Sequence, residues 1–265
     1  MNQTLKGRQL LVTRPARQAD KLCQLIAEQG GVAVRFPTIA IVGLEGFSDK
    51  PNINNTAATN PLPQLSNCQW LIFISANAVN FALKAIDGKI AQLKEAKIAA
   101  IGQATAKELG FSGLQVDLLP QTGFDSEAIL AMPELQTVNG QDILIVRGQG
   151  GREELANVLR SRGANVNYWE VYKRVIPQLD CSKVIELLLN NQLDLIIITS
   201  FEALQNLIVM LGANHNKKLL NIPLVVVSSR ISRLAAELGF TRIAVANSPS
   251  DQAIIESAIA LVNGE

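Results

Sequence analysis

Two stretches of the sequence decide the fold: IFISANAV at residues 72–79 and IITSFEAL at residues 197–204. Each begins as an apolar run, reaches a serine, and continues into residues that favour a helix. The two serines, Ser75 and Ser200, lie 125 positions apart. Because serine is a preferred helix N-cap, the pattern predicts a buried strand that leads directly into a helix, once in each half of the chain.

The duplication extends over most of the chain. Three further pairs of segments match in the same order, namely 11–36 with 144–169, 98–111 with 225–240, and 126–129 with 251–254. Self-similarity of this kind indicates repeated supersecondary units. The repeated unit is a strand, a loop, a helix and a second strand.

The apolar runs show no polar alternation, as expected of parallel strands that helices cover on both faces. Glycines mark the predicted helix ends and short polar residues the predicted helix starts. The predicted ends are Gly30, Gly110, Gly163 and Gly239, and the predicted starts are Ser75, Thr105, Ser126, Ser200 and Ser248–Asp251. We therefore expect an α/β protein of doubly wound, flavodoxin-like parallel sheets.

Two stretches depart from this regularity. Residues 46–66 are rich in Asn, Pro, Thr and Ser and are interpreted as an excursion loop. Residues 36–42 and 169–176 are extended and β-rich, and each contains or precedes a proline. We interpret them as paired connectors between domains, in which case the domains do not coincide with the sequence halves.

Composition sets limits on the class of protein. With 265 residues, two domains are expected, and the 48% hydrophobic and 18% charged residues are typical of a globular chain. The apolar runs are far shorter than the roughly 20 residues of a membrane span, and the first residues predict no leader, so we expect a cytoplasmic protein. The three isolated cysteines favour neither disulfides nor a metal site, and the net charge of +1 favours neither nucleic acid nor membrane as a partner.

Candidate site residues follow from the predicted sheets, because ligands of doubly wound folds bind at the carboxyl ends of the strands. Helix starts and arginines at such positions suit carboxylates or phosphates, which predicts an anionic ligand. Helix capping alone would explain Ser75, Thr199 or Ser200 singly, but not the repetition of the set in both halves. The candidates are Arg14, Ser75, Asn77, Gly102, Thr105, Arg147, Gly151, Arg152, Thr199, Ser200, Ser228 and Ser229.

Common catalytic motifs do not fit the chain. Residues 148–152, GQGGR, lack the third glycine of a dinucleotide fingerprint, and the chain has no phosphate-binding loop of the GxxxxGK[ST] type. His215 is the only histidine and lies in a polar stretch, which excludes a histidine triad. Tyr172, in a predicted connector, is interpreted either as a packing residue or as a proton donor in a cleft.

Taken together, the motifs resemble those of uroporphyrinogen-III synthase. The resemblance runs in order along nearly the whole chain, through 12–15 (VTRP), 73–79 (FISANAV), 100–106 (AIGQATA), 146–148 with Gly151 and Arg152, 171–172 (VY) and 198–200 (ITS). It implies two domains joined by a two-stranded linker. Domain 1 would be discontinuous, with residues 1–36 and 177–265; domain 2 would span 43–168, and the linker strands 37–42 and 169–176.

The resemblance also implies an activity, the cyclisation of hydroxymethylbilane to uroporphyrinogen III with inversion of ring D through a spiro intermediate and loss of water. It implies no cofactor and no metal. Tyr172 would assist departure of the hydroxyl and Thr105 would donate a cleft hydrogen bond, while the other candidates would bind acetate and propionate groups. The family's Gly-Pro-x-Thr pattern is replaced here by SSRI at residues 228–231, so Ser228 or Ser229 would substitute for the threonine.

The expected partner is therefore a linear tetrapyrrole polycarboxylate. We expect a monomer, and the resemblance allows a transient contact with the enzyme of the preceding step. A non-catalytic, two-lobed cytoplasmic protein that closes on an anionic small molecule is the alternative. It explains the duplication equally well, and the product formed from hydroxymethylbilane distinguishes the two.

Overall fold

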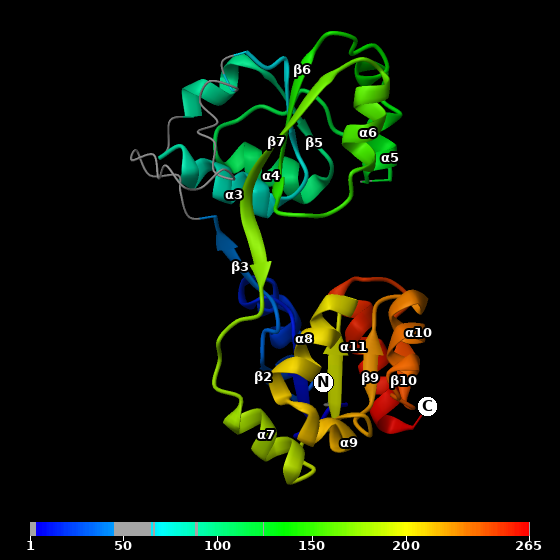
Figure 1. The fold of residues 1–265 in the computed structure, drawn as a ribbon. Helices are drawn as coiled ribbons and strands as arrows, with labels where there is room; N and C mark the ends of the chain where they lie inside the picture. Colours follow the sequence, from blue (N-terminus) through cyan, green and yellow to red (C-terminus); the bar gives the residue numbers. More distant parts are fainter. Residues whose placement is uncertain (1–3, 45–64, 66, 88–89, 124, 265) are drawn as a thin grey trace. The chain divides into compact units, whose positions relative to one another are not determined.

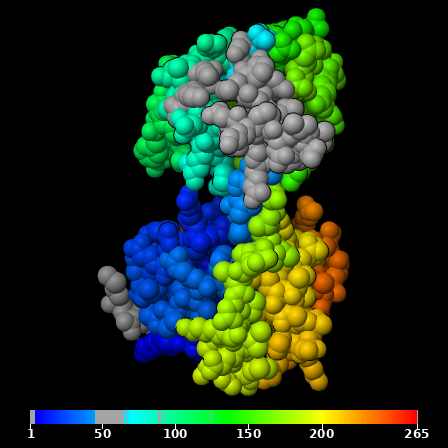
Figure 2. Space-filling view, turned by 60° about the vertical axis from the view of Figure 1, so that its left-hand side comes forward, coloured from blue at the N-terminus to red at the C-terminus, as the bar shows by residue number. Residues whose placement is uncertain are grey.

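The computed structural model describes residues 4–44, 65, 67–87, 90–123 and 125–264, which fold into two compact units (Figure 1). Unit 1 comprises Met1–Ala40 with Val175–Glu265, and unit 2 comprises Ile41–Arg174. In Figure 2 the surface of unit 1 carries blue atoms from the first segment and yellow-green to orange atoms from the last. Among the described residues, no helix combines the length and apolar character needed to cross a membrane.

Unit 1 is built on a five-stranded sheet in the order β10-β9-β8-β1-β2, in which all neighbouring strands are parallel. Its strands are β1 (Gln9–Val12), β2 (Val32–Arg35), β8 (Leu195–Ile198), β9 (Leu224–Val226) and β10 (Ile243–Val245). Its helices are η1 (Ala16–Gln18), α1 (Asp20–Glu28), α7 (Ser182–Leu189), α8 (Phe201–Leu211), η4 (Ala213–His215), α9 (Asn216–Leu219), α10 (Ser229–Glu237) and α11 (Asp251–Asn263).

Both faces of this sheet are covered by helices. Alternate strand residues such as Leu10 and Ile197 pack with α1 and α11, whereas Leu11 and Ile198 pack with α7, α8 and α10. All four residues of β8 are buried. This explains the apolar runs without alternation, because a strand enclosed on both faces has no side that contacts water.

Unit 2 is built on a second five-stranded sheet in the order β3-β7-β6-β4-β5, with β7, β6, β4 and β5 parallel. Its strands are β3 (Ala40–Gly43), β4 (Trp70–Phe73), β5 (Lys97–Ala100), β6 (Asp142–Gly148) and β7 (Asn165–Val175). Its helices are α3 (Ala76–Ala85), η2 (Ile90–Glu95), α4 (Gln103–Phe111), α5 (Ser126–Leu130), η3 (Pro133–Leu135) and α6 (Glu154–Ser161).

Helices also cover both faces of the second sheet. The face formed by residues such as Leu144 and Val146 packs against α3 and α4, and the opposite face, with Ile143 and Ile145, packs against α5 and α6 (Figure 1). The predicted fold class is therefore confirmed: each unit is a doubly wound α/β layer structure around a parallel sheet.

The predicted duplication has a direct structural counterpart. In unit 1 the central strands stand in the order β2-β1-β8-β9, and in unit 2 their sequence equivalents stand in the same order, β7-β6-β4-β5. An isolated bridge between Ala99 and Leu118 occupies the place next to β5 that β10 occupies next to β9. Each sheet therefore contains strands from both sequence halves, in the flavodoxin-like order.

Some predicted boundaries differ from the observed ones. Gly30, Gly163 and Gly239 follow α1, α6 and α10 with positive φ, as predicted, but Gly110 lies inside α4 and Gly113 takes the positive φ after that helix. Thr105 is the third residue of α4 rather than its start, because Gly102 is the N-cap. The predicted excursion at 46–66 lies outside the described residues except for Leu65.

The predicted linker segments overlap strands in part, at residues 40–42 in β3 and 169–175 in β7. The boundary between the units falls between Ala40 and Ile41 and between Arg174 and Val175, within the segments 37–42 and 169–176. However, β7 begins at Asn165 and runs without interruption to Val175. Residues 169–175 therefore form the second part of β7, whose pairing with β6 reaches Tyr172.

Candidate active site

The candidate residues gather at one edge of each sheet. The strand order reverses between β1 and β8 in unit 1 and between β6 and β4 in unit 2. Ligands of open α/β sheets bind at such reversal points, beyond the carboxyl ends of the strands. Arg14, Thr199 and Ser200 follow the first pair of strands, and Ser75 follows β4 in the second.

In unit 2 the structure brings Ser75 and Tyr172 together. The two hydroxyl oxygens lie 3.2 Å apart, and either can donate the hydrogen bond. Ser75 is the N-cap of α3, and its Oγ accepts the N–H of Ala78 at 3.1 Å. The serine is therefore held by the helix start, and its position fixes the phenol that meets it.

Three further contacts confine Tyr172. Its side chain is buried, and its ring lies 5.7 Å from that of Phe81, at an angle of 33°. The residue of β6 that pairs with Tyr172 is Gly148, and a Cβ added there would lie 2.4 Å from Cε2 of Tyr172. The N–H of Gln149 donates to the carbonyl of Tyr172 at 2.7 Å. The aromatic ring can occupy this place only because residue 148 has no side chain.

Arg147 is buried with 3% of its surface exposed, and its guanidinium is engaged within the chain. Nε donates to the carbonyl of Gly148 at 3.1 Å, one Nη donates to Glu153 at 3.1 Å, and the other donates to the carbonyl of Gly150. The guanidinium carbon lies 4.5 Å from the centre of the Tyr168 ring. The guanidinium expected to meet a ligand carboxylate is thus hydrogen-bonded to groups of its own chain.

Glu153 and Tyr168 influence one another's ionisation beside this arginine. The Tyr168 hydroxyl donates to the Glu153 carboxylate, and this hydrogen bond, with that from Arg147, holds the pKa of Glu153 below its usual value. Burial, and secondly the same hydrogen bond, raises the pKa of Tyr168. Both shifts favour an ionised carboxylate beside a neutral phenol.

The remaining candidates of unit 2 surround the carboxyl edge of its sheet. Asn77 is the second residue of α3 and Gly102 is the N-cap of α4, while Thr105 is buried one turn further along α4. Gly151 and Arg152 are exposed in the loop between β6 and α6. Arg152 is therefore the arginine of this group that solvent reaches.

The candidates of unit 1 form the corresponding edge. Ser200 caps α8 and accepts the N–H of Ala203 at 3.1 Å, and Ser228 caps α10. Thr199 precedes Ser200, and Ser229 is the exposed first residue of α10. Arg14, directly beyond β1, forms an ion pair with Asp251, whose helix α11 begins at the same edge. Hydroxyls and helix starts thus lie at this edge together with the Arg14–Asp251 ion pair, and the N–H groups of the helix starts suit an anionic group.

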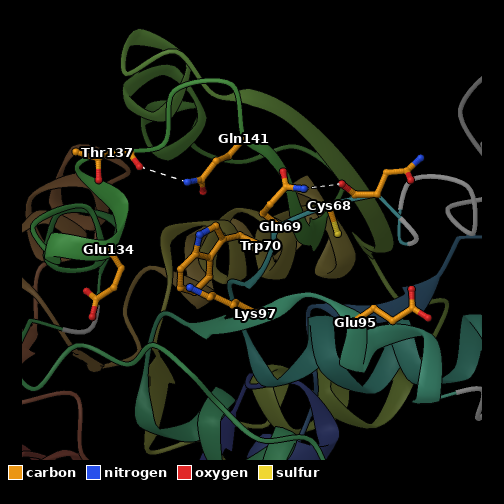
Figure 3. Close-up of a pocket in the computed structure, with 9 residues that line it drawn as sticks. Cys68, Gln69, Trp70, Glu95, Lys97, Glu134, Thr137 and Gln141 are labelled. Atoms are coloured by element: carbon orange, nitrogen blue, oxygen red, sulfur yellow. Dashed lines mark hydrogen bonds between the residues drawn. The ribbon is translucent and has the colours of Figure 1, made fainter.

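A pocket of about 640 Å³ lies at the opposite, amino-terminal edge of the unit 2 sheet (Figure 3). Its lining includes Cys68, Trp70 and Lys97, which precede or begin β4 and β5, and Gln141 before β6. The Lys97 ammonium lies 5.4 Å from the centre of the Trp70 ring, and burial raises the pKa of Cys68 to about 11. No candidate residue lines this pocket, so it is separate from the predicted site.

Comparison with known proteins identifies the family. A family model described as Uroporphyrinogen-III synthase HemD matches residues 20–256. The chain belongs to the uroporphyrinogen-III synthase family. The uroporphyrinogen-III synthase of Escherichia coli (strain K12) is 33% identical to it over 252 residues, which cover 94% of this chain and 98% of the relative. That of Salmonella typhimurium (strain LT2) is 32% identical with the same coverage.

Solved structures of uroporphyrinogen III synthases share the fold. A crystal structure of a mutant of the Thermus thermophilus protein aligns with a TM-score of 0.61 and 16% identity, covering 98% of this chain and 100% of that one. The Helicobacter pylori protein also aligns with a TM-score of 0.61 and 16% identity, over 96% and 99% of the two chains. At this identity the alignments establish the architecture alone.

Sequence reasoning missed several residues that shape the site of this family member. Glu153 and the aromatic ring of Tyr168 contact Arg147, Asp251 pairs with Arg14, and Gly148 makes room for Tyr172. The Asp251 contact had a sequence signal, since an acidic residue in the first turn of a helix lies near the strand ends. Within the part of the chain that the structure describes, no group of three His, Cys, Asp or Glu residues is placed to hold a metal ion.

Proposed function

We propose that this chain cyclises hydroxymethylbilane to uroporphyrinogen III, inverting ring D through a spiro intermediate and releasing water, and thus acts as a cyclising hydro-lyase. Family membership over nearly the whole chain supports the reaction. The observation that carries the proposal is the Tyr172 hydroxyl, 3.2 Å from Ser75 beside the strand-order reversal of unit 2. A phenol held there suits a proton donor.

The chemistry needs positioning and one proton transfer. Tyr172 donates a proton to the departing hydroxyl, which leaves as water and generates an azafulvenium-like electrophile. The substituted carbon of ring D attacks it to give the spiro intermediate. Fragmentation and reclosure then invert the ring, and the proton lost from the ring carbon restores the phenol. A general acid contributes about 10²–10⁴-fold, and holding the strained conformer contributes further.

Ser75 supports this role of Tyr172. Its Oγ accepts the N–H of Ala78, so its own hydrogen remains free to point at the Tyr172 oxygen. A hydrogen bond donated to the phenolate stabilises the charge that appears when the proton leaves. Thr105 is proposed to supply a further hydrogen bond to the substrate.

The acetate and propionate groups of the substrate are proposed to bind at the two carboxyl edges. Arg152 in unit 2 and Arg14 in unit 1 supply the cations, and helix starts at Ser75, Gly102 and Ser200 supply N–H groups. We propose further that the protein acts in the cytoplasm as a monomer and receives its substrate from the enzyme of the preceding step.

The direct test is the identity of the product. Purified protein is incubated with freshly prepared hydroxymethylbilane, the product is oxidised, and its isomers are separated. Uroporphyrin III is expected, whereas buffer alone yields the type I isomer. If the protein binds the substrate but only type I forms, the non-catalytic binding protein is the correct interpretation.

A further inference from the structure

We infer that Arg147 and Gly148 are positioning residues for Tyr172, and that Arg147 holds the turn after β6 rather than a substrate carboxylate. The inference rests on the proposed function, because it concerns the residue to which that proposal gives the proton transfer. The packing that carries it can be measured without any substrate.

The first observation is a register shift that redirects Tyr172. Along β6 and β7, Arg147 pairs with Glu170, but the next residue, Gly148, pairs with Tyr172, so Val171 is an extra residue in β7. If side chains alternated strictly along β7, Tyr172 would lie on the same face of the sheet as Tyr168. Instead Val171 and Tyr172 are both buried in the core that contains α3. A bulge that redirects a side chain is a common device beside active sites.

The second observation is the close approach of Tyr172 to the backbone of Gly148. An added Cβ would lie 2.4 Å from Cε2 and 2.6 Å from Cζ of the tyrosine ring. These distances are far below van der Waals contact, so any side chain at residue 148 must displace the ring. The displacement would move the hydroxyl that meets Ser75.

The third observation is that a single peptide group connects Arg147 with Tyr172. The carbonyl of Gly148 accepts from Nε of Arg147, and the N–H of Gln149, in the same peptide group, donates to the carbonyl of Tyr172 at 2.7 Å. Arg147 also holds the carbonyl of Gly150. The rigid fork of a guanidinium suits this task, because it can fix two carbonyls and a carboxylate at once.

The hydrogen bonds that Arg147 makes within the chain oppose its alternative role as a substrate ligand. Its side chain is 3% exposed, it donates to three partners of its own chain, and Tyr168 stacks on it. Binding a substrate carboxylate would require these contacts to break. Arg152, five residues further on, is exposed and needs no such rearrangement.

A thermodynamic cycle tests the packing. Gly148→Ala is made in the wild-type chain and in a Tyr172→Ala background, and unfolding is followed in urea. We expect a large loss of stability in the wild-type chain and little or none once the ring is gone. Gly110→Ala is the matched control, since its added Cβ would have no described neighbour within 4 Å beyond the adjacent residues and the nearby backbone of α4, and it should not couple to residue 172. An equal loss in both backgrounds overturns the inference.

Kinetics test the positioning role. Gly148→Ala and Arg147→Lys should each lower kcat at least tenfold while KM stays within about threefold, because a misplacement of about 1 Å can cost 10²-fold. Lysine keeps the positive charge of Arg147 but lacks the planar guanidinium that holds two carbonyls and a carboxylate. A rise in KM with unchanged kcat would show that Arg147 binds the substrate, and would overturn the inference. Unchanged kcat in Gly148→Ala would also overturn it. A wild-type chain that forms only the type I isomer instead refutes the proposed function, and the unfolding cycle remains interpretable.

Discussion

Replacing Tyr172 by Phe should damage the reaction far more than the fold. The ring remains and still fills the space against Phe81 and Gly148, so only the 3.2 Å hydrogen bond to Ser75 is lost. A neutral hydrogen bond contributes about 0.5–1.5 kcal/mol. The Oγ of Ser75 still accepts the N–H of Ala78, so the serine hydroxyl is not left without a hydrogen bond. The loss of stability should therefore fall at the lower end of that range.

The kinetic effect should be several times larger in free energy. Loss of a general acid lowers turnover by about 10²–10⁴-fold. Because each tenfold change corresponds to about 1.36 kcal/mol, this is roughly 3–5 kcal/mol of barrier. Turnover is measured as formation of the type III isomer, and stability is measured by urea unfolding of the same preparation.

Tyr168→Phe provides a matched control, since Tyr168 and Tyr172 are the two tyrosines of the chain. It removes the hydroxyl that donates to Glu153 but keeps the ring that lies over Arg147. We expect turnover within about threefold of the wild type. If Tyr172→Phe also keeps turnover within threefold, the phenol is not the proton donor and the reasoning fails.

Three further outcomes follow from the structure. Gly163→Ala should destabilise the fold by more than the roughly 1–2 kcal/mol that a left-handed conformation costs, because the added methyl would also meet Asn139. Gly113→Ala should cost only the conformational part, since its added methyl would have no described neighbour within 4 Å beyond the adjacent residues, and equal losses of stability in urea would contradict this. Because burial raises the pKa of the Cys68 thiol to about 11, this thiol ionises in the unfolded chain before it does in the folded one, and the free energy of unfolding should fall between pH 9 and 11. The same fall in a Cys68→Ala chain would disprove the assignment to Cys68. Ser200→Ala should cost about 1 kcal/mol through loss of the α8 cap, and Ser200→Asn should restore most of it, as measured by unfolding.

The architecture was predictable because it depends on local patterns that both halves repeat. Apolar runs followed by Ser75 and Ser200 specify strands and helix starts, and the structure has them at those positions. A helix end was harder to predict where two nearby glycines could each take the positive φ that follows a helix. Gly110 and Gly113 both follow the apolar stretch of α4, and only the observed backbone shows that Gly113 takes the positive φ.

The geometry of the site was predictable only in part. The carboxyl ends of strands could be located from the sequence, so the candidates do lie at the sheet edges. The pairing of Tyr172 with Ser75 depends on a register shift at Gly148, which no spacing in the sequence displays. Arg147 ends an apolar run and was expected to face a ligand. Its burial depends on partners up to 23 residues further along the chain, which local patterns do not reveal.

The insertion of unit 2 within unit 1 has a consequence for synthesis on the ribosome. All strands of the second sheet lie within Ala40–Val175, so this sheet can close as soon as that stretch has emerged. The earlier strands β1 and β2 must wait for β8, which is made only at Leu195–Ile198. Domains commonly fold in the order in which they are translated. Here we expect the segment translated first to complete its fold last, because β1 lacks its neighbour β8 until residues 195–198 have been made.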